Sequence, residues 1–226
     1  MNWISQAIAW LTDPVHLAGP TGLWALVGQH LAITGWATLI AVVIGVPAGL
    51  VIGHTGRGRQ LVVGLSGAAR ALPAIGLLTM VALIAGIGLI GPLVALVVLA
   101  MPSVIAGAYS GIDSIEPVTR DAARGVGMSP MQVLWQVELP LALPQLVGGI
   151  RAAALQVIAT ATLAAYVGAG GLGVLLFRGL KTQDYPQMLA GSIVVVALAF
   201  LVDAVFEVLG RLISRCTGVV NLATSR

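Results

Sequence analysis

Long uncharged segments alternate along this chain with short segments that carry most of the charged residues. Neither Leu31–Gly53 nor Ala71–Ile112 contains a charged residue. A membrane-spanning helix needs about 20 apolar residues, so the first segment predicts one span and the second predicts a helical hairpin that turns near 86–92. The pattern predicts an all-helical membrane protein with about five transmembrane helices. Their expected ranges are 31–53, 71–90, 92–112, 147–169 and 188–210.

The segment 1–28 is predicted to lie at the membrane surface rather than to cross it. It contains Trp3, Trp10 and Trp24, and tryptophan favours the headgroup level of a bilayer. Asp13-Pro14 and Gly19-Pro20 argue against a span there. The predicted organisation is an N-terminal interfacial segment at 1–28, a transmembrane domain at 29–215 and a tail at 216–226.

Composition excludes an ordinary soluble domain. Hydrophobic residues make up 58% of the chain and charged residues only 8%, whereas soluble domains carry roughly a quarter charged residues. The sequence pI near 9.6 does not indicate nucleic-acid binding, because the basic residues lie at the ends of predicted helices rather than in one patch. Cys216 is the single cysteine, which excludes an intrachain disulfide.

A polar loop, residues 117–140, separates the third and fourth predicted spans. Pro117 suits the first turn of a helix but cannot continue one, so a short helix is predicted over 118–124. Gly127 permits a turn with positive φ, which would end this helix.

The second half of the polar loop carries a capping box, Ser129-Pro130-Met131-Gln132. Ser129 is the expected N-cap, with Pro130 as the first helical residue and Gln132 at N3. A second short helix is therefore predicted over 131–137, and Leu139-Pro140 is expected to close it and lead into the next span. Together the two helices predict a compact helix–turn–helix that projects from the membrane.

The polar loop fits the pattern E-A-A-x3-G-x9-I-x-L-P, with Asp121 in place of Glu and Val137 in place of Ile. In this it resembles the cytoplasmic loop by which permease subunits of ATP-binding-cassette importers dock on their ATPase partner. The resemblance implies that the chain is not an enzyme and carries no cofactor, since ATP and magnesium bind to the separate ATPase. The coupling residues that it implies are Asp121, Ala122, Ala123, Gly127, Leu139 and Pro140. An ordinary amphipathic loop is the alternative interpretation.

The basic residues predict an orientation for the spans. If the polar loop is cytoplasmic, all but two of the 11 Lys and Arg residues fall on the cytoplasmic side. Arg178 and Lys181 are the two that fall outside. Cytoplasmic segments of membrane proteins carry an excess of Lys and Arg, so the N-terminus is predicted outside and the C-terminus in the cytoplasm.

Three longer stretches extend the resemblance over roughly 30–215. They are ALPAIGLLTMVALIAGIG, MPSVIAGAYSGIDSIEP and ELPLALPQLVGGIRAAALQVIATATLAAYVGAGGLGVLLFRGL. They resemble permease subunits of osmoprotectant importers, which carry glycine betaine, choline, carnitine or proline betaine across the cytoplasmic membrane. The resemblance implies the fold of small type I importers, similar to the methionine permease.

The same resemblance implies a set of partners. Two permease subunits, identical or paralogous, would line one pathway in the lipid bilayer, with two ATPase subunits below and an extracytoplasmic binding protein above. The run AYVGAGGLG at 165–173 also occurs in methionine and phosphonate permeases. A permease for methionine or another amino acid is therefore the alternative function.

A glycine-rich segment lies between the fourth and fifth predicted spans. Such a run cannot form a stable helix, and non-helical backbone at membrane depth must be buried in protein or line a water-filled cavity. A flexible element near an outer gate and a tight turn between helices are the two interpretations. The glycines are Gly168, Gly170, Gly171 and Gly173.

Two prolines and two tyrosines complete the candidates for a substrate pathway. Pro73 and Pro102 interrupt predicted spans, and a proline kinks its helix. Tyr109 and Tyr166 offer aromatic faces, which quaternary ammonium ligands favour.

Small residues recur on the first predicted span. Ala41, Gly45, Gly49 and Gly53 are spaced four apart, so they form a stripe that predicts close helix packing. On the last span, Asp203, Glu207 and Arg211 share one face, and a Glu207–Arg211 ion pair in a structural network is predicted.

Other classes of function find little support. His16, His30 and His54 are scattered near span ends, so a metal site is not expected, and no catalytic constellation is present. An ion-coupled secondary transporter usually needs ionisable groups near the membrane midplane. The first three predicted spans contain no charged residue.

Overall fold

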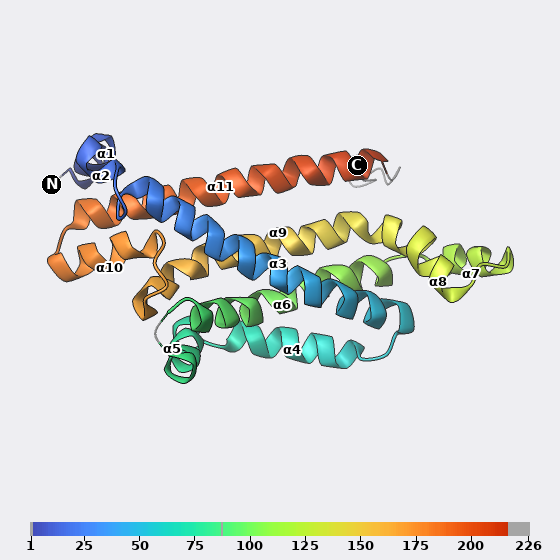
Figure 1. The fold of residues 1–226 in the computed structure, drawn as a ribbon. Coiled ribbons are helices and arrows are strands. Elements are labelled where there is room, and N and C mark those ends of the chain that lie inside the picture. The colour runs from blue at the N-terminus through green and yellow to red at the C-terminus, as the bar shows by residue number, and fades with distance from the viewer. Residues whose placement is uncertain (1, 87, 217–226) are drawn as a thin grey trace. The chain divides into compact units, whose positions relative to one another are not determined.

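The computed structural model describes residues 2–86 and 88–216, and every regular element in these ranges is helical. Figure 1 follows them from α1, shown in blue, to α11, shown in red. In chain order they are α1 (Trp3–Thr12), α2 (Pro14–Leu17), α3 (Leu23–Thr55), α4 (Arg59–Ala71), α5 (Ala74–Ala85), α6 (Ile90–Asp113), α7 (Pro117–Gly125), α8 (Pro130–Val133), the π-helical turn η1 (Leu134–Glu138), α9 (Leu139–Ala164), the 3-10 turn η2 (Ala165–Val167), α10 (Gly173–Thr182) and α11 (Tyr185–Cys216).

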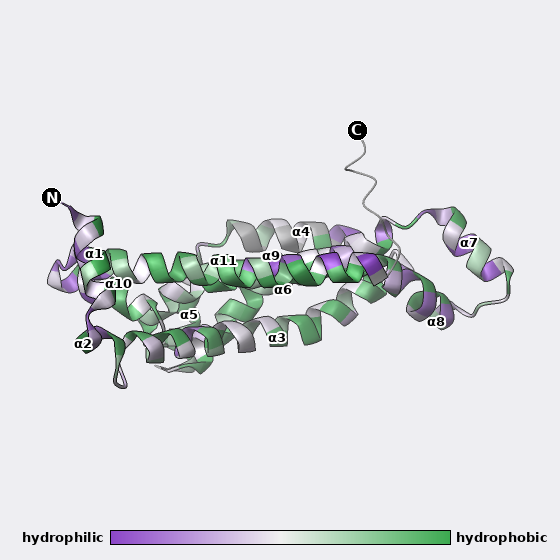
Figure 2. Cartoon of the chain, turned by 90° about the horizontal axis from the view of Figure 1, so that it is seen from above, coloured by the Kyte–Doolittle hydropathy of each residue, from purple (hydrophilic) through white to green (hydrophobic). Residues whose placement is uncertain are grey.

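Four helical stretches in the described residues are long and apolar enough to cross a membrane. They are Leu23–Thr55, Ile90–Asp113, Pro130–Val167 and Tyr185–Arg215. Figure 2 shows the prevalence of hydrophobic residues along these helices. The predicted spans 31–53, 92–112 and 188–210 each fall within one of them, and 147–169 extends two residues beyond Val167.

The remaining predicted span, 71–90, is not one continuous helix. α4 ends at Ala71 and α5 begins at Ala74, with Pro73 as the N-cap of α5. The residue before a proline disfavours the helical conformation, and this separates the two helices. α5 has 12 residues and ends at Gly86, whose φ is +84°. At 1.5 Å per residue it is about 18 Å long, which is shorter than a bilayer core of about 30 Å.

One helix boundary differs from expectation. α3 begins at Leu23 rather than at Leu31, so Trp24 lies in its first turn. At the other end, the predicted tail 216–226 lies outside the described residues except for Cys216. The N-terminal part that precedes α3 forms α1 and α2, which meet at Asp13, whose Oδ1 accepts a hydrogen bond from Val15 N at 3.0 Å.

The chain divides into two compact units. Unit 1 comprises the described residues of 1–40, 70–100 and 154–202, and unit 2 those of 41–69, 101–153 and 203–226. The core of unit 1 joins α3, α10 and α11 with the segment before α10. Its buried residues are Leu23, Leu26, Leu172, Leu175 and Leu198.

The core of unit 2 is built from α3, α6, η1 and α9. Its buried residues are Leu50, Ala108, Ile112, Leu134, Ala142 and Leu146. The glycine stripe of α3 faces α6 here: a Cβ added at Gly49 would lie 2.6 Å from Ala108 Cβ, and one at Gly53 would lie 2.9 Å from Ile112 Cβ. The predicted close packing is therefore confirmed, and the partner helix belongs to the same chain.

Candidate functional site

The polar loop folds as the sequence predicts in its first half. Pro117 begins α7, which ends at Gly125, and Gly127 adopts a φ of +91° in the turn that follows. Figure 1 shows α7 and α8 beyond the ends of α6 and α9. Figure 2 shows that hydrophilic residues are frequent in this part of the chain.

The predicted capping box is present at the start of α8. The backbone N of Gln132 donates to Ser129 Oγ at 3.4 Å, and the backbone N of Ser129 donates to Gln132 Oε1 at 2.8 Å. The prediction that Leu139-Pro140 closes the second helix is wrong. α8 continues through the π-helical turn η1 into α9, and Pro140 lies in the first turn of α9. Inside a continuous helix a proline removes one backbone hydrogen bond, and Pro140 lies just after the π-helical turn η1.

The loop presents both its motif residues and several apolar side chains at the surface. Asp121, Ala122 and Gly127 are exposed, Ala123 is buried, and Leu139 and Pro140 are half-buried. Large apolar side chains are also exposed on α7, in the turn and on α8 and η1. They are Val118, Val126, Met131 and Trp135, of which Val126 is 80% exposed. Apolar side chains are thus exposed on each part of the polar loop.

A buried carboxylate lies where the loop meets the long helices. Glu138, the last residue of η1, is fully buried. Its Oε2 lies 2.6 Å from His54 Nδ1 on α3, and its Oε1 lies 3.3 Å from Arg120 Nε on α7. Arg120 also donates from Nη2 to the carbonyl oxygen of Ile112, in the last turn of α6. We call His54, Arg120 and Glu138 the Glu138 cluster.

The Glu138 cluster was not predicted from the sequence. Arg120 directly precedes the motif, and Glu138 occupies a position inside it that the pattern leaves open. His54 is 84 residues from Glu138 along the chain. A lone charged residue between the apolar positions of Val137 and Leu139 is the one local signal that could have indicated Glu138.

The family of binding-protein-dependent transport system inner membrane components matches residues 20–215. The chain belongs to this family. A permease of this family works with a substrate-binding protein and with an ATPase that is a separate subunit, so the permease is not itself an enzyme.

Two relatives of the permease are similar over most of their length. The choline transport system permease protein OpuBB of Bacillus subtilis is 31% identical over 183 residues, which are 81% of this chain and 84% of the relative. The osmoprotectant import permease protein OsmW of Salmonella typhimurium is 36% identical over 201 residues, which are 84% of this chain and 92% of the relative.

A solved structure confirms the predicted fold of the permease. The MetNI methionine ABC transporter, in an inward-facing conformation, superposes with a TM-score of 0.75 and 26% identity, over 84% of this chain and 95% of that chain. The all-helical fold is therefore that of a type I importer permease, similar to the methionine permease.

The pathway candidates fall in different parts of the permease. Tyr109 lies in unit 2, where it is buried and the Arg59 guanidinium lies 5.9 Å from its ring centroid. Pro102 is buried within α6, which continues through it. Pro73 is exposed in unit 1, at the start of α5.

Tyr166 lies in unit 1, on η2, and is 60% exposed. Its ring centroid is 5.5 Å from that of Phe177 on α10. An open hollow of about 340 Å³ is lined by Tyr166 together with residues of α5 and the segment after η2. The lining residues are Thr79, Ala82, Leu83, Tyr166, Val167 and Gly168. None of these side chains is charged.

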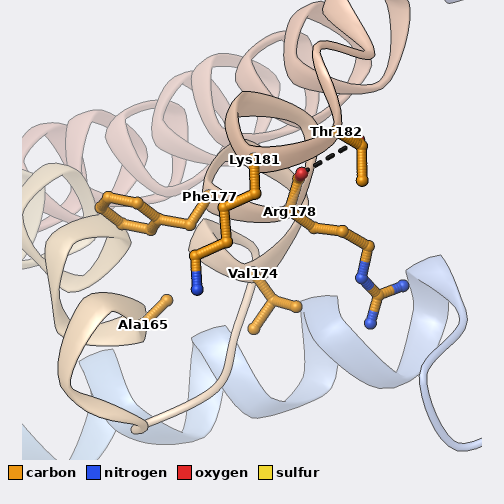
Figure 3. A pocket seen from close by; sticks show the side chains of 6 residues that line it. All are labelled: Ala165, Val174, Phe177, Arg178, Lys181 and Thr182. Atoms are coloured by element: carbon orange, nitrogen blue, oxygen red, sulfur yellow. Dashed lines mark hydrogen bonds between the residues drawn. The ribbon is translucent and has the colours of Figure 1, made fainter.

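A second hollow, of about 360 Å³, lies beside α10. Figure 3 shows the side chains that line it: Ala165, Val174, Phe177, Arg178, Lys181 and Thr182. Arg178 and Lys181 make this hollow cationic. It is therefore a poor site for a positively charged ligand.

The glycine-rich segment forms a compact connection between η2 and α10. Gly168, Gly170 and Gly171 have φ values of +88°, +82° and +77°. The backbone N of Gly171 donates to Gln29 Oε1 at 3.2 Å, and a Cβ added at Gly171 would lie 3.1 Å from Nδ1 of the buried His30. Gly173 begins α10. The segment thus packs against α3 at Gln29 and His30.

Charged residues meet on α9 and α11 in unit 2. The predicted pair is present, with Arg211 Nη2 2.8 Å from Glu207 Oε1. Arg151 joins it: its Nη1 donates to Glu207 Oε2 at 3.1 Å, and its Nε and Nη2 both donate to Asp203. Arg151 is the single charged residue of the predicted span 147–169. An intramembrane arginine needs an acidic partner, and this signal could have identified the contact.

Proposed function

We propose that the chain is the membrane-spanning subunit of an ATP-driven importer for quaternary-amine compatible solutes such as glycine betaine and choline. The observation that carries the proposal is its similarity to OpuBB and OsmW, whose names describe choline transport and osmoprotectant import. Both similarities extend over most of the chain, so they include the spans as well as the polar loop.

The polar loop is the proposed docking site for the ATPase. Its two short helices, capping box and turn make it a compact element that can transmit force. The exposed Val118, Val126 and Met131 supply apolar surface for the partner. The proposed coupling residues remain Asp121, Ala122, Ala123, Gly127, Leu139 and Pro140.

The hollow beside Tyr166 is the proposed substrate contact on the outer side. An uncharged lining with one aromatic face suits a trimethylammonium group, which a ring attracts through its quadrupole. The open shape of the hollow fits weak binding, and a translocation pathway must release its substrate. In this account the glycine-rich segment is part of the outer gate, and Pro73, Pro102 and Tyr109 belong to the pathway.

The proposed assembly contains a second permease, identical or paralogous, two ATPase subunits and an extracytoplasmic binding protein. The excess of basic residues near the polar loop supports an orientation with the N-terminus outside and the C-terminus in the cytoplasm. α1, with Trp3 and Trp10, would lie at the outer membrane surface, and residues 216–226 would form a cytoplasmic tail.

Uptake in cells tests the proposed substrate. Labelled glycine betaine is supplied after a salt upshift to cells with and without this gene, in a background that lacks other betaine importers. Unlabelled choline, carnitine, proline and methionine serve as competitors. The proposal predicts that uptake depends on the gene and that choline or carnitine competes. Uptake of methionine instead, unaffected by the quaternary amines, would favour an amino-acid permease, the function named for the structural neighbour.

A further inference from the structure

The Glu138 cluster brings together elements that are distant in sequence. Glu138 lies on η1, His54 in the last turn of α3, and Arg120 in the middle of α7. Through Arg120 the cluster also reaches the carbonyl oxygen of Ile112 in α6. Ile112 in turn packs against Gly53, the residue before His54. Contacts therefore run from α7 to α3, α6 and η1 around one buried carboxylate.

The burial of this cluster distinguishes it from a surface ion pair. The side chain of Glu138 is 1% exposed, that of His54 16% and that of Arg120 22%. A buried carboxylate is costly unless it is paired, whereas exposed pairs contribute little. Both oxygens of Glu138 have a basic neighbour, so α7 and α3 are each connected to the same carboxylate.

The local helix geometry adds a second observation. Glu138 ends a π-helical turn, and such turns are rare and occur frequently at functional sites. Leu134, at the start of the same turn, is buried in the unit 2 core with Ile112 and Leu50. η1 thus carries one apolar and one ionic contact into the body of unit 2, directly before α9 begins.

A catalytic or metal role for Glu138 is not supported. The carboxylate is fully buried, so no reactant reaches it in this conformation. Within the described residues no group of three His, Cys, Asp or Glu side chains is arranged to hold a metal ion. A mechanical role remains, since the groups that surround the carboxylate belong to the polar loop and to the long helices.

We propose that Glu138 is a positioning residue that couples the polar loop to α3 and α6. When the ATPase displaces α7, Arg120 transmits this displacement to Glu138 and Ile112, and Glu138 transmits it to His54. α7 also contains a buried apolar residue, Ala123, so we expect the loop to stay folded without the cluster. Loss of the ionic contacts then leaves docking intact but lets α7 move without the spans. The inference rests on the proposed function.

The test uses the complete transporter in proteoliposomes and measures substrate uptake and ATP hydrolysis in parallel. Glu138→Gln keeps the side-chain volume and removes the charge. We expect the ratio of solute imported to ATP hydrolysed to fall at least about tenfold, as for loss of a charged buried hydrogen bond, while the ATPase still co-purifies. Glu138→Asp should restore part of the ratio. Glu116→Gln, an exposed carboxylate at the start of α7, is the matched control and should leave the ratio unchanged.

An unchanged ratio for Glu138→Gln, or equal losses of uptake and ATP hydrolysis, would overturn the inference. If Glu138→Gln does not assemble, Arg120→Lys decides the question. This variant keeps the positive charge beside Glu138 but lacks the planar guanidinium that also reaches Ile112. It should therefore lower the ratio of solute imported to ATP hydrolysed. An unchanged ratio would overturn the inference. Wild-type complexes distinguish failure of the proposed function from failure of the Glu138 inference. If wild-type complexes import no solute of the competition panel, the proposed function fails together with this inference. If they import normally and the variant ratio is unchanged, the Glu138 inference alone is rejected.

Discussion

Arg151 on α9 and Asp203 on α11 form a two-pronged ion pair, with Nε 2.6 Å from Oδ1 and Nη2 2.8 Å from Oδ2. The planar guanidinium matches the carboxylate geometry, which makes such pairs strong and specific. Both residues lie in helices that are apolar enough to cross a membrane. There, a charge without a partner is more costly than in water.

The first prediction concerns this pair. Arg151→Ala leaves Asp203 and Glu207 without their shared partner, so the unfolding temperature of the purified permease should fall by several degrees. Arg151→Lys keeps the charge but not the fork and should fall between wild type and Arg151→Ala. The measurement is thermal unfolding in nanodiscs.

Arg211→Ala is the matched control, because the Arg211 side chain is mostly exposed and pairs with Glu207, at the edge of the cluster. Its unfolding temperature should remain close to that of wild type. Wild-type stability in Arg151→Ala would show that the two-pronged pair does not hold α9 and α11 together.

The second prediction concerns close packing of α3 on α6. A valine at position 49 would overlap Ala108 Cβ and the carbonyl oxygen of Ile105, which lie 2.6 Å and 2.7 Å from the added Cβ. Overpacking of this kind costs roughly 1–3 kcal/mol, so Gly49→Val should lower both stability and the amount of folded protein in the membrane.

Gly35→Ala on the same helix provides the control, since a Cβ there meets nothing within 4 Å. Replacing a glycine inside a helix by alanine stabilises it by about 0.5–1 kcal/mol. Equal effects of Gly49→Val and Gly35→Ala on thermal unfolding would contradict the packing described for Gly49.

The third prediction concerns the turn of the polar loop. Gly127 has a φ of +91° and an open surrounding, so Asp and Asn, which tolerate such backbone better than most residues, strain it to a similar degree. Gly127→Asp adds a negative charge to the proposed docking surface. It should reduce uptake at least about tenfold, with normal insertion in the membrane.

Gly127→Asn has nearly the same shape without the charge, and it should retain most of the uptake. Co-purification of the ATPase measures docking directly. If the Asp and Asn variants bind the ATPase and import equally well, this turn is not part of the docking surface.

The fourth prediction concerns Tyr166. A cation–π contact at an exposed site contributes about 0.5–1 kcal/mol, so Tyr166→Ala should raise the KM for choline or glycine betaine uptake roughly two- to fivefold. Tyr166→Phe keeps the ring and should leave KM near the wild-type value. Uptake kinetics in cells give both values, and identical KM values for the Ala and Phe variants would exclude an aromatic contact there.

Local chemistry explains which parts of the loop could be predicted from the sequence. Pro117, Gly127 and the Ser129 capping box act on residues within one helical turn, so their spacing specifies the structure. Leu139-Pro140 was misjudged because a proline next to an apolar residue is compatible with a helix start as well as with a helix end. Whether the helix ends or continues at Leu139-Pro140 depends on the π-helical turn η1, which the spacing of residues in the sequence did not predict.

Contacts over long sequence separations were the part that could not be predicted. His54, Arg120 and Glu138 are ordinary polar residues in the sequence, and only the folded chain shows that the carboxylate of Glu138 is buried between the other two side chains. The apolar helix within the second predicted span is shorter than 71–90. α5 begins after Pro73, which constrains the backbone before it, and it ends at Gly86, whose φ is +84°.

The central claim is that this permease imports quaternary amines with energy from a separate ATPase. The most direct measurement is accumulation of labelled glycine betaine in proteoliposomes that contain the permease, its ATPase and its binding protein, with each component omitted in turn. The account predicts accumulation that requires ATP and all components, and that choline or carnitine inhibits while methionine does not. Accumulation that persists without the ATPase, or that only methionine inhibits, would contradict it.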